Sequence, residues 1–214
     1  MLCIGHAGAS GIAPANTLRS FALAASLGAD RIEFDVRGWR GRTVLAHTSL
    51  DARFGRCLSL DEALEELSVP RYAGIDFVVD LKTRDAAEPA VDALRRHGLF
   101  ARALLTSQCP PILALVRAHA PDARTGISVA GRFSRRLQRW GCWRTEVLAA
   151  LHAGEYDALM AHHRLIDTEL VAAVADAGAE LHAWTIHGPR DIPALRALGV
   201  DGVVTSDPRL LAAA

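Results

Sequence analysis

The sequence predicts an α/β fold, a (β/α)8 TIM barrel with a short β-hairpin arm after the second strand. Two observations lead to it. Short apolar runs alternate with longer segments of helical periodicity along the 214 residues, and this alternation is typical of a parallel sheet. With the hairpin arm set aside, eight strands are counted, the number that closes a barrel. A doubly wound open sheet is the alternative, but no G-x-G-x-x-G or P-loop follows any strand. We expect a single domain over residues 1–214.

The first half of the chain supplies three barrel strands and the arm. Asn16 or Thr17 can cap the first helix and Gly28 can end it, and Ser59 with Glu62 forms a capping box for the second. The expected strands are residues 2–6, 32–36 and 77–81, and the expected helices are 17–27, 60–67 and 85–97. Residues 43–47 are also extended. Only a turn-like stretch at 38–41 separates them from the second strand, which predicts a hairpin.

The second half continues the alternation. The expected strands are residues 103–106, 125–129, 158–161, 181–186 and 202–205, and the expected helices are 111–120, 167–177 and 191–198. A basic segment follows the fifth strand and contains Arg132, Arg135, Arg136, Arg139, Trp140, Trp143 and Arg144. Two interpretations stay open for it: contacts with an anionic substrate or a lipid surface, or a solvated helix face with the tryptophans packed beneath.

Composition narrows the class of partner. The 24 basic residues balance the 24 acidic residues, so no field attracts nucleic acid or membrane generally. No apolar run reaches the roughly 18 residues of a membrane span. The cysteines Cys3, Cys57, Cys109 and Cys142 show no metal-binding spacing. We expect reduced thiols and a cytoplasmic protein without a signal peptide. The oligomeric state stays open.

Three carboxylates are expected at the mouth of the barrel. Glu33 and Asp35 are two residues apart in a strand, so they point to one face. Asp80 adds a third carboxylate from the next strand. Buried carboxylates repel one another unless a cation or a proton compensates them. Three oxygen ligands on rigid strands suit one Mg²⁺ or Ca²⁺ ion, while pairing with arginines at the barrel rim is the alternative.

Other polar residues follow the predicted strands. His6 ends the first strand, and the hairpin returns His47 to the level of Glu33. Trp184 and Thr185 lie at the end of the strand at 181–186, and His187 comes directly after it. His162 and His163 are adjacent, so at most one of them is expected to point inward.

Lys82 is the only lysine of the chain, beside 23 arginines. An ammonium is a compact point charge, whereas a guanidinium is broad and prefers a planar, forked partner. Lys82 therefore has two interpretations: a specific charge beside Asp80, or a strand-end residue whose head reaches water.

Read together, seven motifs carry a family resemblance: I-G-H-A-G-A at 4–9, P-A-N-T at 14–17, I-E-F-D-V at 32–36, A-H-T at 46–48, V-D-L-K at 79–82, A-W-T-I at 183–186 and G-V-D-G-V-V-T-S-D-P at 199–208. In order and spacing the chain resembles the glycerophosphodiester phosphodiesterase family. The resemblance implies a barrel with one divalent metal ion held by Glu33, Asp35 and Asp80. It also implies an acid–base pair of His6 and His47, and Lys82 beside the phosphate.

The implied reaction is metal-dependent hydrolysis of a glycerophosphodiester to a phosphomonoester and an alcohol. In the family, a neighbouring hydroxyl of the substrate attacks first, and water opens the resulting cyclic phosphate. A metal ion and Lys82 would stabilise the charge of the transition state, and the histidines would move the protons. The alternatives are a phosphorus–oxygen lyase that releases the cyclic phosphate and a non-catalytic anion-binding barrel.

The motifs also depart from the usual family pattern. Ala7 stands where the family usually has arginine, Ala15 where it has glutamate, and Thr48 where it has aspartate. Asp80 replaces a glutamate, and the W-T-V-N motif ends in His187. The lost arginine would have contacted the phosphate. Either the pocket is reshaped for a different phosphodiester, with His187 or a distant arginine supplying that contact, or catalysis is weak or absent. The retained histidines, carboxylates and lysine favour activity, with Trp184 and His187 contacting the substrate.

Overall fold

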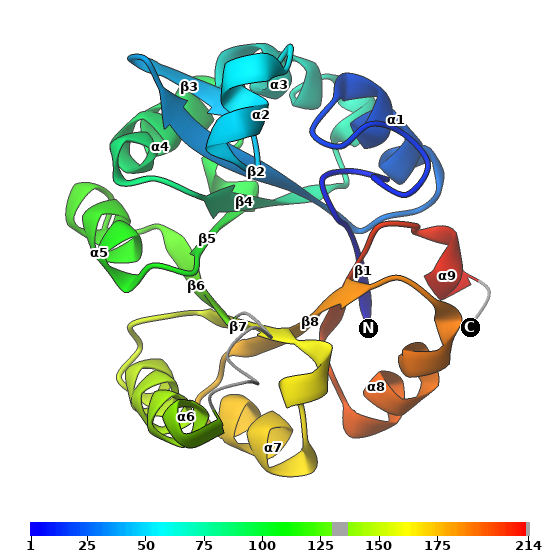
Figure 1. Cartoon of the computed structure of the whole chain (residues 1–214), viewed down its shortest axis with the longest axis vertical. Helices are drawn as coiled ribbons and strands as arrows, with labels where there is room; N and C mark the ends of the chain where they lie inside the picture. The colour runs from blue at the N-terminus through cyan, green and yellow to red at the C-terminus, as the bar shows by residue number, and fades with distance from the viewer. Residues whose placement is uncertain (130–136, 213–214) are drawn as a thin grey trace.

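The structure, a computed structural model, describes residues 1–129 and 137–212, with the backbone alone for 137–142 and Ala212. Eight parallel strands form a closed barrel with helices around it (Figure 1). The hydrogen-bonded order is β1-β9-β8-β7-β6-β5-β4-β2, and pairing of β1 with β2 closes the ring. The predicted barrel is therefore confirmed, and the open doubly wound sheet is excluded.

The strands lie close to the predicted positions. Their bounds are β1 Leu2–Gly5, β2 Arg31–Trp39, β3 Arg42–Leu45, β4 Asp76–Leu81, β5 Ala103–Ser107, β6 Arg124–Val129, β7 Ala158–His162, β8 Glu180–Ile186 and β9 Gly202–Thr205. Lys82 follows β4 directly, and His163 begins a 3₁₀ turn after β7.

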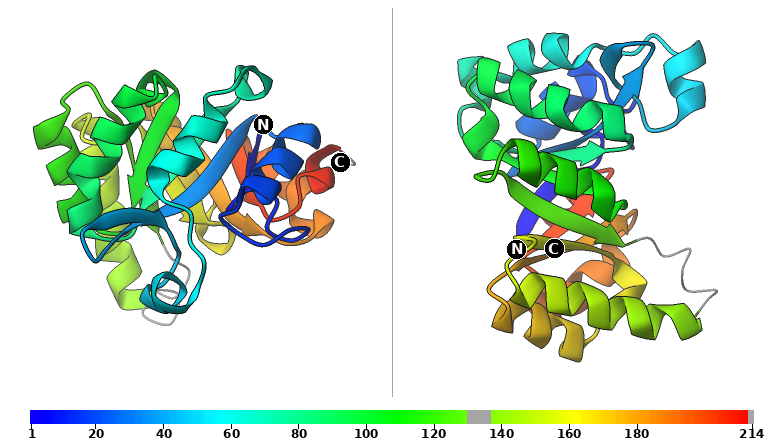
Figure 2. Two further views of the ribbon diagram at one scale, coloured as in Figure 1. Left: turned by 90° about the horizontal axis from the view of Figure 1, so that it is seen from above. Right: turned by 90° about the vertical axis from the view of Figure 1, so that its left-hand side faces the viewer.

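The helices cover the outside of the barrel (Figure 2). The α-helices are α1 Leu18–Ser26, α2 Ser49–Phe54, α3 Leu60–Leu67, α4 Ala87–Arg96, α5 Pro110–His119, α6 Leu137–His152, α7 Thr168–Asp176, α8 Ile192–Leu198 and α9 Arg209–Ala212. The 3₁₀ turns are Pro70–Tyr72, Arg84–Ala86, Phe100–Arg102, His163–Leu165 and Pro189–Asp191. Thr17 caps α1, and Ser59 and Glu62 form the predicted capping box of α3. The helix α2 was not predicted.

The expected hairpin is present. β3 pairs antiparallel with the outer end of β2, with Val36 opposite Leu45 and Trp39 opposite Arg42. The arm and α2 project together from one side of the barrel, as the right-hand view of Figure 2 shows. This side is the carboxyl end of the parallel strands, where barrel enzymes carry their active sites.

Alternation along the strands separates two apolar layers. Outward side chains such as Ile32, Phe34 and Phe77 pack under the helices and are fully buried. The barrel interior holds a small separate cluster of Ile4, Val78, Leu104, Ala158, Met160 and Val204. Successive residues of a strand face opposite sides, so every second residue points into the barrel. The inward-facing polar residues therefore lie nearer the two ends of the barrel axis than this small apolar cluster.

Charged residues fill the amino-terminal end of the barrel. Glu180 accepts hydrogen bonds from Arg31 and Arg124, each at 2.6 Å, and its carboxylate lies 2.8 Å from Nε2 of His182. Arg31, Arg124 and Glu180 are the first residues of β2, β6 and β8, so three strands share one ion-pair network. Hydrogen bonds from His182 and Arg31 hold the pKa of Glu180 well below its ordinary value.

Three cysteines of the described part, Cys3, Cys57 and Cys109, are free thiols. None of the described helices combines the length and the apolar character needed to cross a membrane.

Removal of the Glu180 charge should weaken the barrel at neutral pH. Glu180→Gln should lower the free energy of unfolding by about 2 kcal/mol at pH 7. This is less than the roughly 3–5 kcal/mol for a fully buried pair, because the Glu180 side chain is 28% exposed. For a domain of this size the melting temperature should fall by about 4–8 °C.

The effect should depend on pH with a definite sign. The folded pKa of Glu180 lies below its ordinary value, so its contribution is complete above about pH 4.3 and is lost as the pH falls below that value. The gap in melting temperature between wild type and Glu180→Gln should therefore narrow from pH 7 to pH 3. Glu169→Gln is the control, since the Glu169 side chain is 91% exposed. An equal difference in melting temperature between wild type and Glu180→Gln at pH 7 and pH 3 would contradict the lowered pKa of Glu180.

Candidate active site

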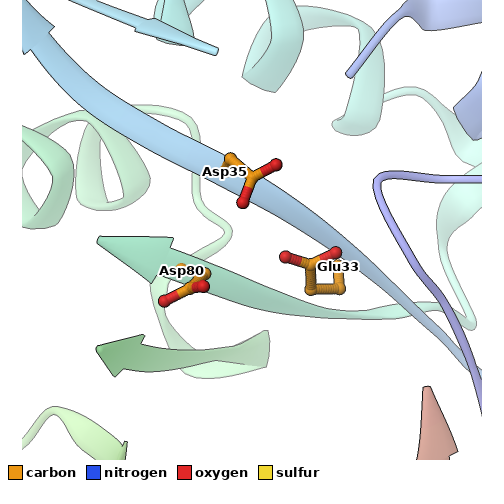
Figure 3. Close-up of side chains that lie close together, drawn as sticks. All are labelled: Glu33, Asp35 and Asp80. Carbon is orange, nitrogen blue, oxygen red and sulfur yellow. The ribbon is translucent and has the colours of Figure 1, made fainter. Parts of the chain in front are cut away.

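Three carboxylates converge at the carboxyl end of the barrel (Figure 3). Glu33 and Asp35 lie on β2, and Asp80 lies on β4, where it is directly opposite Asp35 in the strand register. One oxygen from each carboxylate lies within 4.8 Å of the others. The period-two spacing of β2 therefore brings its two acids to the same point as the acid of the neighbouring strand.

The carboxylates sit in an environment that disfavours their charge. Glu33 is 5% exposed and Asp35 is 2% exposed. Burial, followed by repulsion from Asp35 and Asp80, raises the pKa of Glu33 well above its ordinary value, and burial also raises the pKa of Asp80. Among the described residues, Oδ1 of Asp80 is buried without a hydrogen-bond partner. The cluster thus holds more negative charge than its neighbours compensate.

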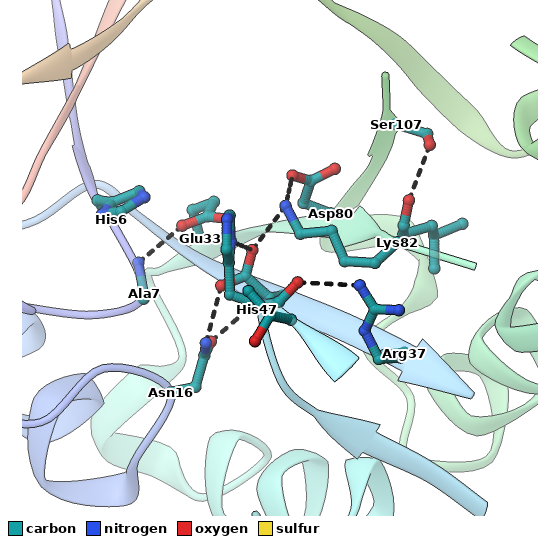
Figure 4. A network of polar contacts seen from close by, with 12 residues as sticks. His6, Ala7, Asn16, Glu33, Arg37, His47, Asp80, Lys82 and Ser107 are labelled. Atoms are coloured by element: carbon teal, nitrogen blue, oxygen red, sulfur yellow. Dashed lines mark hydrogen bonds and ion pairs between the residues drawn. The ribbon is translucent and has the colours of Figure 1, made fainter. Parts of the chain in front are cut away.

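Lys82 lies within this cluster. Its Nζ is 2.7 Å from Oδ1 of Asp35 and 2.5 Å from Oδ2 of Asp80 (Figure 4). Burial works against the charged ammonium, but attraction to Asp80 and Asp35 outweighs it and raises the pKa of Lys82. The side chain is only 15% exposed, so the simple picture of a strand-end lysine reaching water does not describe it.

The loop between β1 and α1 is tied to the two acids of β2. The backbone N–H of Ala7 donates to Oε2 of Glu33 at 2.7 Å, and Asn16 donates through Nδ2 to Oδ2 of Asp35 at 2.8 Å. Asn16 also accepts from the backbone N–H of Asp35 at 3.0 Å. Gly8 has φ +80°, and a Cβ there would lie 2.4 Å from Oγ of Ser20, so the loop needs glycine at this position.

The hairpin arm delivers His47 to the cluster. Nδ1 of His47 lies 3.0 Å from Oδ1 of Asp35, and this hydrogen bond is the main reason that the pKa of His47 is raised. Asp35 itself keeps a low pKa: burial would raise it, but the hydrogen bond to His47 and the charge of Lys82 outweigh burial. Arg37 donates through Nη2 to the backbone carbonyl of His47 at 3.0 Å, which fixes the end of the arm.

His6 lies on the other side of the same pocket. Its Nδ1 is 3.2 Å from Oγ of Ser10, and burial lowers its pKa. The two predicted histidines thus have environments that shift their pKa values in opposite directions. Such a pair suits one proton acceptor and one proton donor.

One pocket at the barrel mouth brings most of the predicted residues together. His6, Glu33, Asp35, His47, Asp80, Lys82, Trp184 and Thr185 all line it. The pocket also includes Thr106, Gln108 and Ser128, which our reading of the sequence missed. Each of them stands at the end of a barrel strand or just beyond it, so the rule that found Asp80 could have found them too.

Other predicted residues lie elsewhere. His187 is exposed, does not line this pocket, and has its Nδ1 3.2 Å from Oγ of Ser206. The rings of His162 and His163 stack at 4.4 Å, and neither lines the pocket.

The basic segment is described only in part. Arg132, Arg135 and Arg136 lie outside the described residues, as do the side chains of Arg139 and Trp140. Arg144 makes a bidentate ion pair with Asp167 at 2.8 and 2.7 Å, and Trp143 packs against the core beneath the helices. For these two residues the structure agrees with the second interpretation, in which the tryptophan packs beneath the helix and the arginine lies on its surface.

The site residues fit a divalent cation. Their donors are carboxylate oxygens, which Mg²⁺ and Ca²⁺ prefer, and the orphaned Oδ1 of Asp80 belongs to the same cluster. Lys82 supplies one positive charge against three carboxylates, so a second cation would relieve the remaining repulsion.

The fold and the site together define a (β/α)8-barrel enzyme that has its acids, histidines and lysine at the carboxyl ends of the strands. The model of the glycerophosphoryl diester phosphodiesterase family matches residues 6–68 and 75–210, and the chain belongs to this family. It is therefore a phosphoric diester hydrolase.

Individual relatives are distant but match almost end to end. A glycerophosphodiester phosphodiesterase of Caldanaerobacter subterraneus subsp. tengcongensis is 26% identical over 98% of this chain and 96% of its own length. A crystal structure from Silicibacter pomeroyi has a TM-score of 0.84 at 22% identity, covering 100% of this chain and 93% of its own. A phosphodiesterase of Oleispira antarctica, solved with the product sn-glycerol-3-phosphate, has a TM-score of 0.77 at 23% identity, with 100% and 96% covered.

Proposed function

We propose that the protein hydrolyses a glycerophosphodiester to a phosphomonoester and an alcohol, with one divalent cation, Mg²⁺ or Ca²⁺. The observation that carries this proposal is the convergence of three carboxylates, two histidines and one lysine in a single pocket. A phosphodiester needs positive charge around its oxygens and proton transfer on both sides of the phosphorus.

Glu33, Asp35 and Asp80 would hold the cation. When bound, the ion supplies positive charge that stabilises the phosphate oxygens in the transition state. Lys82 adds a point charge from the same side of the pocket, held there by Asp35 and Asp80. Asn16 and the backbone of Ala7 orient two of the carboxylates, which leaves the strands and the loop as one rigid support.

The two histidines divide the proton transfers. His6 is half-buried and has a lowered pKa, which suits the acceptor of a proton from the attacking hydroxyl. His47 has a raised pKa through its hydrogen bond to Asp35, which suits the donor of a proton to the leaving alcohol. Oδ1 of Asp35 thus holds the proposed proton donor His47, and the same oxygen also contacts Nζ of Lys82.

The glycerol part of the substrate is supported by the relatives. The Oleispira antarctica structure contains sn-glycerol-3-phosphate, and the Caldanaerobacter relative is a glycerophosphodiester phosphodiesterase. We propose Trp184 as a substrate contact in the pocket, and His187, which is close enough to affect the pKa of His6, as a contact outside it. The free thiols of Cys3, Cys57 and Cys109 support a cytoplasmic location.

A ³¹P NMR time course with sn-glycero-3-phosphocholine and Mg²⁺ tests the reaction. We expect the diester signal to be replaced by that of a phosphomonoester, and a chelator should stop the conversion until Mg²⁺ or Ca²⁺ is returned. Accumulation of a cyclic phosphate as the end product would identify a lyase instead. An unchanged spectrum would indicate a non-catalytic anion-binding barrel.

Calorimetry on the same preparation tests the cation site independently of turnover. The wild type should bind one divalent cation, and the ion should raise the melting temperature by linkage. Glu33→Gln should bind at least about tenfold more weakly, the lower end of the effect of altering groups at a metal site. Glu65→Gln, which changes an exposed acid of α3, is the control. Equal affinity in Glu33→Gln and wild type would remove Glu33 from the site.

The histidine pair should be separable from folding. His6→Ala and His47→Ala should each lower turnover by about 10²-fold or more, the usual contribution of a general acid or base. Both variants should keep the melting temperature and divalent-cation binding of the wild type to a large extent. His119→Ala, which breaks an ion pair with Asp92 between outer helices, is the matched control. A histidine whose removal leaves turnover near the wild-type value has no part in the mechanism.

Catalysis should require the compact ammonium group of lysine at position 82, and not only a positive charge there. Lys82→Met should lower kcat more than it raises KM, because the charge acts mainly in the transition state. Lys82→Arg should restore little, since the broad guanidinium would pair with Asp80 as a fork instead of lying between two carboxylates. Circular dichroism melts should show similar stability for the arginine variant and wild type. Wild-type turnover by Lys82→Arg would show that the compact shape of lysine is irrelevant.

A further inference from the structure

A second cavity opens beside the active-site pocket and shares a wall with it. His6, Asp35 and His47 line both cavities. The second cavity continues outward from these residues between the β1–α1 loop and α2, and we call it the α2 groove. Because the two cavities share these three residues, a substrate held at the phosphate site can extend into the groove.

The outer wall of the α2 groove is apolar and exposed. Leu50 and Phe54 are 64% and 75% exposed, the highest values among the exposed large hydrophobic residues of the described part. They are four residues apart on α2 and therefore lie on one face of the helix. None of the residues of α2 is buried, so these side chains contribute little to the core of the barrel.

The facing wall and the floor carry no charge of their own. Ala7, Pro14 and Ala15 from the β1–α1 loop form one side, and Leu45 and Ala46 at the end of β3 form the floor. All three alanines belong to motifs that the sequence singled out, and none offers a polar group to a substrate through its side chain.

The charged residues of the groove are largely engaged or stand at its ends. The carboxylate of Asp51 accepts from the backbone N–H and the hydroxyl of Thr48 at 2.8 and 2.7 Å, which caps α2. Asp35 belongs to the catalytic cluster, and Arg56 follows α2 at the far end. Asn16 and Thr17 also line the groove, but the amide of Asn16 donates to Asp35 and the hydroxyl of Thr17 donates to the carbonyl of Pro14. A charged or strongly hydrated alcohol would therefore find few free partners between these ends, whereas an alkyl chain would cover Leu50 and Phe54.

We propose that the α2 groove binds the alkyl part of the alcohol that leaves the phosphate, so that phosphodiesters of apolar alcohols several carbons long are preferred substrates. This inference rests on the proposed function. The junction of the two cavities lies at His6, Asp35 and His47, so the chain of the alcohol would lie along α2 while the phosphate stays in the active-site pocket.

The proposal is tested with a series of phosphodiesters in which the phosphate of glycerol 3-phosphate is esterified with one alkyl alcohol. The ethyl, butyl, hexyl and octyl compounds would be compared below their micelle-forming concentrations, with Mg²⁺ present. Complete burial of a methylene group corresponds to a roughly fourfold gain, and partial burial to less. We therefore expect kcat/KM of the wild type to rise by at least about tenfold from the ethyl to the hexyl compound.

The variants are compared through the hexyl-to-ethyl ratio of kcat/KM within each protein. Phe54→Ser and Leu50→Ser should each lower this ratio at least about threefold, and both positions are exposed enough to tolerate the change. Ile12→Ser is the matched control, because Ile12 is an exposed hydrophobic residue that does not line the groove. Its ratio should equal that of the wild type.

The outcomes separate the groove from the function. Hydrolysis of all esters at rates that do not depend on chain length would overturn the proposal that the groove binds the alkyl chain. It would leave the proposed phosphodiesterase activity standing. A ratio that stays the same in Phe54→Ser and Leu50→Ser would also overturn it, as would a dimer seen by light scattering that Phe54→Ser converts to a monomer. Absence of turnover on every ester would contradict the proposed function itself.

Discussion

The carboxylate of Asp35 joins three parts of the chain that are far apart in sequence. It accepts from Asn16 of the β1–α1 loop, and it faces His47 of the hairpin arm and Lys82 after β4. Hydrogen bonds to a charged acceptor are stronger than neutral ones, and burial makes an unpaired partner costly. The positions of His47, Lys82 and the β1–α1 loop therefore depend on the ionised carboxylate of Asp35, which is almost inaccessible to water.

The barrel interior is divided into two charged ends by a small apolar cluster. The network around Glu180 closes the amino-terminal end, and the cluster around Glu33, Asp35 and Asp80 fills the mouth. The alternation of a single strand, β2, serves both ends: Arg31 points into the lower network, and Glu33 and Asp35 point into the upper one. The two ends differ in composition. The lower network pairs its acid with two arginines and a histidine, whereas the upper cluster gathers acids around one lysine. The first arrangement is suited to stability, and the second suits a bound cation and catalysis.

Much of this could be predicted from the sequence because it depends on period-two alternation and short turns. The eight barrel strands, the hairpin and the convergence of Glu33, Asp35 and Asp80 all follow from these local rules. The contact of Asn16 with Asp35 could not be predicted, because it depends on a loop in which Asn16 has a φ of +57°. The helix α2 was missed because it has only 6 residues, fewer than two helical turns, which is too short for a periodic pattern to identify. Whether His187 faces the pocket or Ser206 is a matter of side-chain direction that its place in the motif does not determine.

The hairpin arm lies outside the closed ring of strands. Within residues 1–129 and 137–212, β3 pairs with the outer end of β2 and otherwise makes one bridge, from Val44 to Ser59. Residues 40–59 thus form a module that carries His47 and the exposed helix α2 together. The module takes no part in the eight strand pairs that close the barrel. With α2 selecting the alcohol as proposed, changes confined to this one peripheral helix would alter the substrate while His47, the carboxylates and the barrel keep their sequence.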